Sequence, residues 1–408
     1  MKFLRNLANT KPINDTVFAV AKLAKADIAQ NGPDNVTNST LGTLYDENME
    51  LVALDSVFNS YNNISNRQKA SYASSFIGNN EYLQSVDQWL FSDLNLTLEH
   101  ATIATIGGSG AISTAFLNTL DANETVIIPD IAWGSYQLMA QQYSLNVATY
   151  QLFEENNFNL KDFKETCLKV SKTQDKLLIV INDPCQNPTG YSMSIEEWEA
   201  VIAFVNELSQ TVPCIILNDI AYIDYAFNQD ARKYMEVFNK IADNVAIFIA
   251  FSTSKTLTSY GLRCGALILL TKQESDLKEL FIVYEKTARS VWSNVPNAAM
   301  INFANIATKY RQEFLAEKAK YVDLLAQRSA LFIKEAKECQ LPIYNYREGF
   351  FVTVKVDNET RDKLHELLLA KHIYTVKTNR GIRIAICSLP LAKIKNLAAK
   401  INDCLKAC

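Results

Sequence analysis

Short apolar runs alternate with longer amphipathic stretches between about residues 100 and 270. The short runs are rich in β-branched residues and almost free of charge, which is typical of strands buried on both faces. Between two of them, Ser194 and Glu197 form a capping box that opens a helix with an apolar face. This alternation predicts an α/β fold, with helices on both faces of a mainly parallel central sheet. The predicted strands are 101–106, 126–128, 177–181, 214–217, 245–251 and 266–270.

The pattern changes near residue 297. A long charged helical stretch is followed by YREGFFVTVKV, a further helix and GIRIAICSL, which together predict a smaller α+β domain. We expect an N-terminal arm and part of the small domain in residues 1–45. The large ligand-binding domain is expected in 46–296, and the small C-terminal domain in 297–408.

Composition and charge narrow the class of protein. The chain of 408 residues is 48% hydrophobic and 21% charged, which is typical of a folded globular protein. Its net charge of −4, without a basic block, argues against nucleic acid or a membrane surface as the main partner. No apolar run reaches the roughly 18 residues of a membrane span, and the first residues lack a secretion-signal pattern. We therefore expect a cytoplasmic protein with reduced cysteines, and its three histidines show no metal-ligand spacing.

Chemically versatile residues follow the predicted strands at their carboxyl ends, where open α/β sheets bind ligands. The glycine-rich stretch GGSGA opens a helix, a geometry that presents backbone N–H groups to a phosphate. The same edge also receives an amide, a carboxylate, a phenol, a lysine and an arginine. These groups come from Gly107–Ala111, Asn182–Gly190, Asp219, Tyr222, Ser252, Lys255 and Arg263.

This set of groups matches the needs of pyridoxal phosphate. The cofactor requires a lysine that holds its aldehyde as a Schiff base, an acid that keeps the ring nitrogen protonated, and an anion site. A free lysine has a pKa near 10.4, so we expect partial burial and the nearby Arg263 to lower the pKa of Lys255. Conversely, a pyridinium beside Asp219 would keep that carboxylate ionised.

A serine hydrolase is an alternative with partial support. The stretch GGSGA misses the G-x-S-x-G elbow around Ser109 only at its last residue, in the correct strand-turn-helix setting. Asp219 and then His365 or His372 follow in the chain order of a catalytic triad. The hydrolase leaves the lysine, the arginine and the NPTG turn unexplained, so we consider it the weaker hypothesis.

The chain resembles the class I pyridoxal-phosphate aminotransferases of fold type I, the group that contains aspartate and aromatic amino acid aminotransferases. The resemblance extends from about Asn38 to the C-terminus. It implies a mainly parallel sheet with a smaller α+β domain, and pyridoxal phosphate as cofactor. The motifs that carry it are Asn187-Pro188-Thr189-Gly190, Asp219 with Tyr222, and Ser252-x-x-Lys255 followed by Arg263.

The resemblance implies a role for each matching residue around the cofactor. Lys255 would be the Schiff-base lysine and catalytic base, and Asp219 the partner of the pyridine nitrogen. Asn187 and Tyr222 would donate to the ring hydroxyl, and Trp133 would stack on the ring. The phosphate would be held by Gly108, Ser109, Ser252 and Arg263.

It also implies residues that bind the substrate and the neighbouring subunit. Arg383 would grip the α-carboxylate, and Arg289 would bind a distal carboxylate in the partner's site. Gly42 would leave room over the substrate, and Tyr72 would reach the phosphate of the neighbouring subunit. The chain departs from the usual pattern at Thr40, Leu44, Tyr45, Gln186 and Trp292, and the side-chain pocket is expected to involve Thr43, Gln186 and Trp292.

The resulting prediction is a cytoplasmic, homodimeric aminotransferase of amino acid metabolism with shared active sites. It would move the amino group of aspartate, glutamate or an aromatic L-amino acid to a 2-oxo acid, with 2-oxoglutarate as the expected acceptor. A β-elimination lyase on the same fold would use the same Lys255 and Asp219 and stays open. A non-enzymatic effector-binding module fits less well, because the chain has every group that the chemistry needs.

Overall fold

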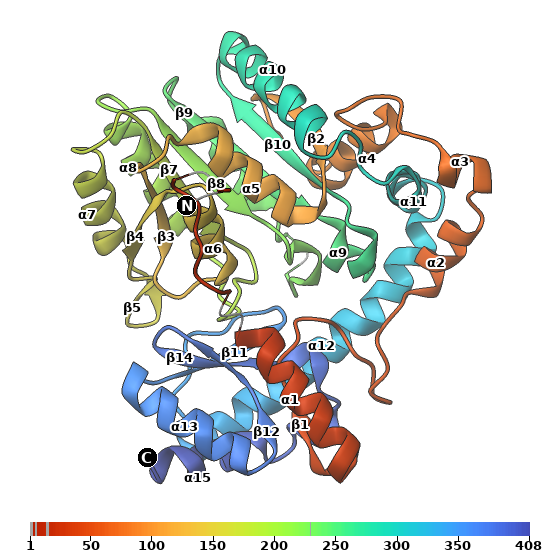
Figure 1. Cartoon of the computed structure of the whole chain (residues 1–408), viewed down its shortest axis with the longest axis vertical. Helices are drawn as coiled ribbons and strands as arrows, with labels where there is room; N and C mark the ends of the chain where they lie inside the picture. Colours follow the sequence, from red (N-terminus) through yellow and green to blue (C-terminus); the bar gives the residue numbers. More distant parts are fainter. Residues whose placement is uncertain (1–2, 5, 14–15, 229) are drawn as a thin grey trace.

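The computed structural model describes residues 3–4, 6–13, 16–228 and 230–408. Part of the expected N-terminal arm lies outside the described residues. This part comprises residues 1, 2, 5, 14 and 15, which belong to the stretch without a secretion-signal pattern. The remaining chain forms a larger upper part around one broad sheet and a smaller lower part around a second sheet (Figure 1).

The broad sheet confirms the predicted α/β architecture. Its strand order is β2-β10-β9-β8-β7-β3-β4, and β10 alone among these strands runs antiparallel to its neighbours. Each predicted strand lies within two residues of an observed one, whereas the edge strand β4 was not predicted. The strands are β2 (Glu99–Thr105), β3 (Thr125–Pro129), β4 (Asn146–Tyr150), β7 (Leu177–Asn182), β8 (Cys214–Asp219), β9 (Val245–Ser252) and β10 (Gly265–Thr271).

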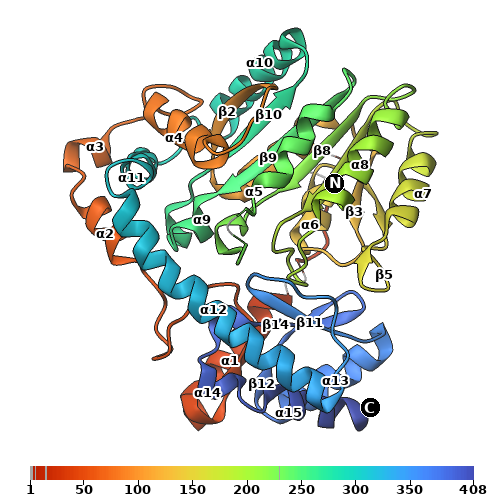
Figure 2. The ribbon, with the colours of Figure 1, turned by 180° about the vertical axis from the view of Figure 1, so that it is seen from behind.

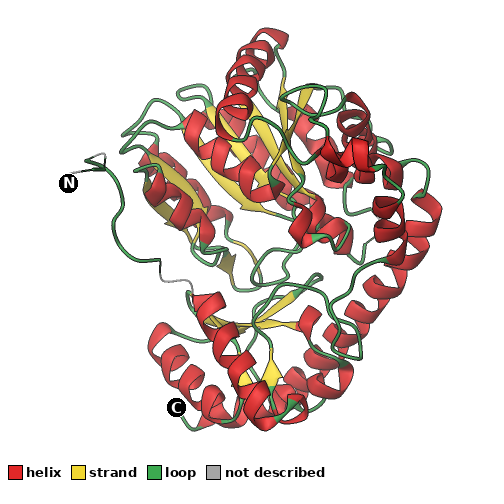
Figure 3. Ribbon diagram, turned by 45° about the vertical axis from the view of Figure 1, so that its right-hand side comes forward, coloured by secondary structure: helices red, strands yellow, loops and turns green. Residues whose placement is uncertain are grey.

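Helices cover both faces of this sheet (Figure 3). The central strand β7 shows why: Leu177, Ile179 and Ile181 belong to one hydrophobic cluster, whereas Leu178 and Val180 belong to another. Side chains alternate between the two faces of a strand, so a continuously apolar strand needs cover on both. One face is covered by α4 (Asn80–Phe91), α7 (Leu160–Val170), α8 (Ile195–Leu208) and α11 (Asn297–Ala307), and the other by α5 (Gly107–Thr119), α6 (Ser135–Gln142) and α10 (Glu274–Val291). The predicted capping box at Ser194 opens α8.

The smaller part contains the antiparallel sheet β11-β14-β13 and joins both ends of the chain. Strand β1 (Thr37–Asn38) pairs in parallel with β12 (Ile373–Tyr374), so residues before 45 do contact the C-terminal part. The domain limits at 45/46 and 296/297 stay a prediction. The other elements here are α1 (Thr16–Asn31), β11 (Phe351–Lys355), α13 (Asn358–Ala370), β13 (Val376–Thr378), β14 (Gly381–Ala385), α14 (Leu391–Ile394) and α15 (Leu397–Lys406).

The long helix α12 (Arg311–Cys339) runs from one part to the other (Figure 2). Short elements fill the connections of the upper part, the turn between α1 and β1, and the end of β14. They are α2 (Asp55–Asn62), α3 (Asn66–Ala70), β5 (Phe153–Glu154), β6 (Asn157–Phe158), α9 (Thr253–Thr256) and the 3-10 turns η1 (Pro33–Asn35), η2 (Ile223–Tyr225), η3 (Lys233–Lys240), η4 (Tyr260–Leu262) and η5 (Ile386–Ser388). Within the described residues, no helix combines the length and apolarity needed to cross a membrane. All eight cysteines are free thiols.

A buried carboxylate ties α12 to the large sheet. Asp224 accepts hydrogen bonds from Arg232 at 2.7 Å, Thr256 Oγ1 at 2.6 Å and Trp89 Nε1 at 3.1 Å, and Lys318 of α12 lies at 3.4 Å. Burial alone would raise the pKa of Asp224, but the Lys318 and Arg232 cations outweigh burial and hold that pKa well below its usual range. Thr256 is the last residue of α9, so the same carboxylate fixes the short helix that follows β9.

We expect Asp224→Asn to lower the free energy of unfolding by about 3–5 kcal/mol at pH 7, because it leaves two partly buried cations without their buried partner. Urea unfolding of the two proteins measures the difference. The folded-state pKa is depressed, so this contribution is present above the unfolded pKa of about 3.9 and is lost as the pH falls below it. Asp243→Asn is the control, since Asp243 pairs with Lys272 at 3.1 Å on the surface and should change stability by less than about 1 kcal/mol. Equal effects of the two substitutions would contradict the interpretation.

Candidate active site

The lysine singled out in the sequence lies directly beyond the central strand β9. Ser252 ends the strand and caps α9, and Lys255 is partly buried on that helix. The Lys255 Nζ donates to the carbonyl oxygen of Gly42 at 2.5 Å. Its ammonium also lies 4.6 Å from the ring centroid of Tyr260 and 5.5 Å from that of Tyr222. The amine therefore sits in a cage of aromatic rings closed by one backbone carbonyl.

This environment changes the protonation of the amine. Burial is the main cause that lowers the pKa of Lys255 to about 8; the Cys387 thiol acts in the opposite direction, and the Arg383 and Arg263 guanidiniums act in the same direction as burial. The direction is the one expected from burial and Arg263 in the sequence. A lysine with this pKa is neutral in a useful fraction of molecules near pH 7, as a nucleophile or proton acceptor must be.

The candidate acid Asp219 stands at the end of β8 and is 4% exposed. It accepts a hydrogen bond from Tyr136 Oη at 2.5 Å and one from the Ala221 N–H at 3.1 Å. Burial raises the pKa of Asp219 to about 6, while the hydrogen bond from Tyr136 acts in the opposite direction. A cation placed against this carboxylate would therefore both stabilise its ionised form and be stabilised by it.

The glycine-rich stretch, which the sequence predicts to be an anion cradle, lies at the start of α5. Ile106 supplies no side-chain cap to that helix, so its first backbone N–H groups have no side-chain partner there. Gly107 has φ +66°, and a Cβ at that position would lie 2.5 Å from Nη2 of Arg263. A Cβ at Gly108 would lie 3.1 Å from the Cβ of Ser252. Only glycine lets the helix N-terminus and the guanidinium approach one another this closely, which is an arrangement suited to a phosphate.

The predicted α-carboxylate site comes from the smaller sheet. Arg383 of β14 is 6% exposed and donates to Asn187 Oδ1 at 3.2 Å and to the carbonyl oxygen of Thr40 at 2.6 Å. Its guanidinium lies 4.4 Å from the ring centroid of Phe351. The two parts of the chain therefore meet at this site, because Asn187 belongs to the loop after β7.

An aromatic wall completes the cluster. A Cβ at Gly42 would lie 2.7 Å from Cζ of Phe351 and 3.6 Å from Oη of Tyr222, so a larger residue would fill the space beside those rings. Trp133 lies between β3 and α6 and packs edge-to-face on Tyr136, with ring centroids 5.5 Å apart. Tyr136 itself contacts Asp219, so the predicted ring-stacking residue stands next to the predicted acid.

Two of the predicted residues do not join this cluster within a single chain. Tyr72 is 84% exposed, in the loop that follows α3. Arg289 lies exposed in the last turn of α10, where it donates to Ser293 Oγ at 2.6 Å and covers the ring of Phe76 at 4.7 Å. Their predicted roles in a neighbouring subunit's site stay predictions.

The alternative serine-hydrolase triad is not assembled. His365 is buried on α13 beside Thr375 Oγ1 at 3.5 Å, and His372 contacts Asp27 at 2.7 Å. Both histidines therefore belong to the smaller part of the chain. Ser109 instead forms part of the first turn of α5, and the carboxylate proposed for the triad accepts from a tyrosine.

The sequence interpretation missed several contributors. Tyr136 and Tyr260 contact the acid and the lysine, yet neither was named as a site residue. Tyr136 stands three residues after Trp133, which is one helical turn and the only local signal that pointed to it. Conversely, the amide of Gln186 donates to the Ile131 carbonyl at 2.7 Å and accepts from Thr189 at 2.6 Å, so it holds the NPTG turn.

Comparison with known proteins places this site in a family. The model of the family "Aminotransferase class I and II" matches residues 42–401. The chain belongs to this family. It is therefore a pyridoxal-phosphate-dependent aminotransferase, as the resemblance in the sequence implied.

Individual relatives agree with this assignment. An aminotransferase structure from Anaerococcus prevotii is 30% identical to this aminotransferase, with a TM-score of 0.95 over 99% of both chains. The aspartate aminotransferase of Pseudomonas aeruginosa is 23% identical over 79% of this chain and 81% of its own length. An aromatic-amino-acid aminotransferase from Burkholderia pseudomallei, described as covalently bound to pyridoxal phosphate, shares the fold with a TM-score of 0.79 and 20% identity over 98% of this chain and 100% of its own.

The residues present in this aminotransferase fit the cofactor. The cradle at Gly107 and Gly108 has no side chain where a phosphate would lie, and Arg263 borders it. Asp219 is buried at the end of β8, the strand that pairs with β9, where it can face a cationic ring nitrogen. Lys255 completes the set with an amine of lowered pKa. Phosphate, ring and aldehyde thus each have a group of suitable chemistry.

We expect Lys255 in the cofactor-free protein to react with a small aldehyde along a titration curve centred near pH 8. Reductive trapping followed by mass spectrometry of the peptide that contains residue 255 measures this between pH 6 and 11. The amine must be neutral to attack, and burial favours its neutral form. Lys255→Arg is the control for peptide assignment and should give no adduct. A midpoint above pH 10 would show that the site does not lower the pKa.

Proposed function

We propose that this aminotransferase moves the amino group of an L-amino acid, dicarboxylic or aromatic, to a 2-oxo acid, with 2-oxoglutarate as acceptor. The observation that supports it most directly is the meeting of Lys255 and Arg383 on one short segment, through the carbonyls of Gly42 and Thr40. A carboxylate gripped by Arg383 would leave the substrate's amino group and Cα on the side of Lys255. Arg383 suits this task because a guanidinium binds a carboxylate through two parallel hydrogen bonds.

Bound pyridoxal phosphate supplies an aldehyde for the substrate's amino group and a ring that accepts electrons. Lys255 would hold the aldehyde in the resting enzyme, and its neutral amine would then remove the proton from the substrate's Cα. Asp219 would keep the ring nitrogen protonated, Asn187 and Tyr222 would donate to the ring hydroxyl, and Trp133 would cover the ring face. The phosphate would be bound by Gly108, Ser109, Ser252 and Arg263.

The proposed preference for dicarboxylic substrates depends on a second subunit. Arg289 is exposed in the single chain, where its side chain contacts the neutral Ser293 and the ring of Phe76. A charged group held this loosely can be redirected at little cost to a distal carboxylate of a partner's substrate. We therefore propose a homodimer in which Arg289 and Tyr72 complete the neighbouring site and Gly42 leaves room over the substrate.

Replacing Lys255 with alanine should reduce transamination between an L-amino acid and 2-oxoglutarate by at least about 10²-fold, the usual contribution of a general base. Product formation followed by chromatography measures this, and released ammonia is assayed in the same samples. Lys278→Ala, at an exposed position on α10, should keep full activity. Full activity of the Lys255 variant would remove the proposed mechanism. Ammonia in place of the amino acid product would indicate the β-elimination lyase.

Mixing two inactive variants tests the shared site. Lys255→Ala and Arg289→Ala, each defective with a dicarboxylic substrate, should regain activity after subunit exchange. A mixed dimer would contain one site with an intact Lys255 from one subunit and an intact Arg289 from the other. Sedimentation of each variant gives the control for dimer formation. Mixed dimers without restored activity would show that Arg289 acts within its own subunit, and full activity of Arg289→Ala alone would show that it has no role in the reaction.

A further inference from the structure

The segment between β1 and α2 carries the two carbonyls that meet the site's cations, yet it has almost no regular structure. Residues 39–50 contain one isolated bridge, between Tyr45 and Leu51, and a turn at 46–50 in which Asp46 accepts from the N–H groups of Asn48 and Glu50. Backbone hydrogen bonds hold Ser39 to Tyr374 and Ala385, but no strand ladder continues from there through Gly42. Something else has to hold the segment in register with the site.

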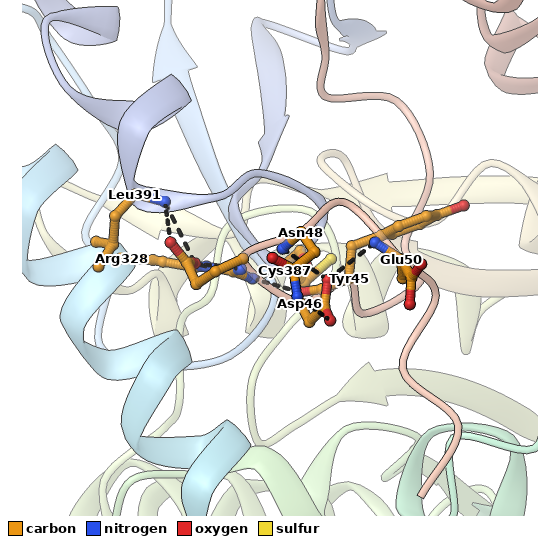
Figure 4. Close-up of polar contacts among 8 residues, drawn as sticks. Tyr45, Asp46, Asn48, Glu50, Arg328, Cys387 and Leu391 are labelled. Carbon is orange, nitrogen blue, oxygen red and sulfur yellow. Dashed lines mark hydrogen bonds and ion pairs between the residues drawn. The ribbon is translucent and has the colours of Figure 1, made fainter. Parts of the chain in front are cut away.

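A buried arginine on α12 supplies this hold. Arg328 is 0% exposed and donates from Nη1 to the carbonyl oxygens of Tyr45 at 2.8 Å and Cys387 at 3.1 Å (Figure 4). Its Nε and Nη2 donate to Oε1 of Glu47 at 3.0 and 2.6 Å. One guanidinium thus binds two points of the segment and one point of the η5 turn that follows Arg383.

Each partner of Arg328 also takes part in a second hydrogen bond. The Tyr45 N–H donates to the Cys387 carbonyl at 3.0 Å, and Glu47 Oε2 accepts from the Leu391 N–H at 2.9 Å. On the other side, the Leu44 N–H donates to Oη of Tyr260 at 2.9 Å, and the Tyr260 ring covers Lys255. The segment is therefore held between the end of β14 and Tyr260 of η4, whose ring covers Lys255.

We propose that Arg328 is a positioning residue for the reaction: through Glu47 and the Tyr45 carbonyl it sets where the Thr40 and Gly42 carbonyls meet Arg383 and Lys255. This inference rests on the proposed function, because it assumes that those two cations bind and process the substrate. Arg328 is not a catalytic residue, since the contacts described for its side chain are with Tyr45, Glu47 and Cys387.

The geometry of the guanidinium is essential to this role. Three of its nitrogens serve three partners that lie in different directions, which a lysine ammonium on a flexible stem does poorly. Substitution of Glu47 should disturb the segment less, because the Glu47 side chain is 42% exposed and water can replace part of its contact with Arg328. We therefore expect graded effects from substitutions at these two positions.

The experiment compares Arg328→Lys, Arg328→Met and Glu47→Gln with a matched control, Arg361→Lys. Arg361 also donates to a backbone carbonyl, that of Thr378 at 2.9 Å, and pairs with Asp362, but it lies on α13. Two quantities are measured for each protein. One is KM and kcat with a fixed amino acid and acceptor, and the other is amide hydrogen exchange of residues 40–45 in the cofactor-free protein.

We expect Arg328→Lys to raise KM for the amino acid about tenfold, with a smaller fall in kcat, and to speed exchange at Leu44 and Tyr45 about tenfold. Arg328→Met should show larger changes, Glu47→Gln smaller ones in the same direction, and Arg361→Lys none. Glu47→Gln should fold even if Arg328→Met does not, because the Glu47 side chain is partly exposed to solvent. Faster exchange with unchanged KM, or unchanged exchange in folded variants, overturns the proposal. Absence of transamination by the unaltered protein would instead overturn the proposed function, while the exchange rates still decide whether Arg328 holds the segment.

Discussion

Two cationic side chains of the candidate active site each donate a hydrogen bond to a backbone carbonyl. Lys255 donates to Gly42, and Arg383 donates to Thr40 and to the side-chain amide oxygen of Asn187; each of these oxygens carries a partial negative charge. A full carboxylate at either place would raise the pKa of the lysine and would occupy the arginine in an internal ion pair. Because these oxygens carry no full negative charge, the two cations can still bind an anionic substrate. The rest of the fold serves to bring this segment, the large sheet and the small sheet to one place.

The fold followed from the sequence where a strand is buried on both faces. In β9, Val245–Ser252, almost every residue is apolar and buried, and Lys255 follows at the predicted edge. The edge strand β4, Asn146–Tyr150, was missed because it has one neighbour in the sheet and only its last residue is buried. Its mixture of polar and apolar residues therefore resembles that of a loop.

The chemistry of the site was predicted from residues that stand at strand ends, because strand and residue are adjacent in the chain. Lys255, Asp219 and Gly107 all follow this rule. Contacts between distant segments leave no such local signal. Arg328 is 281 residues from Glu47 and lies on a highly charged helix, where its pattern is that of a solvated face. Only the packing of α12 against the start of the chain turns it into a buried residue.

Helix α12 carries both of the contacts described above, one through Lys318 and the other through Arg328. Lys318 contacts Asp224 beside α9, and Arg328 contacts the segment that borders the substrate site, ten residues farther along α12. At 1.5 Å per residue, the two side chains are about 15 Å apart along a continuous helix, and they point in directions that differ by roughly 80°. A helix is stiff in length and in twist, so it acts as a spacer of fixed length and phase between α9, which carries Lys255, and the small sheet, which carries Arg383. The insertion or loss of a single residue between these anchors would rotate one of them by about 100° and separate the two halves of the active site without altering any residue in it.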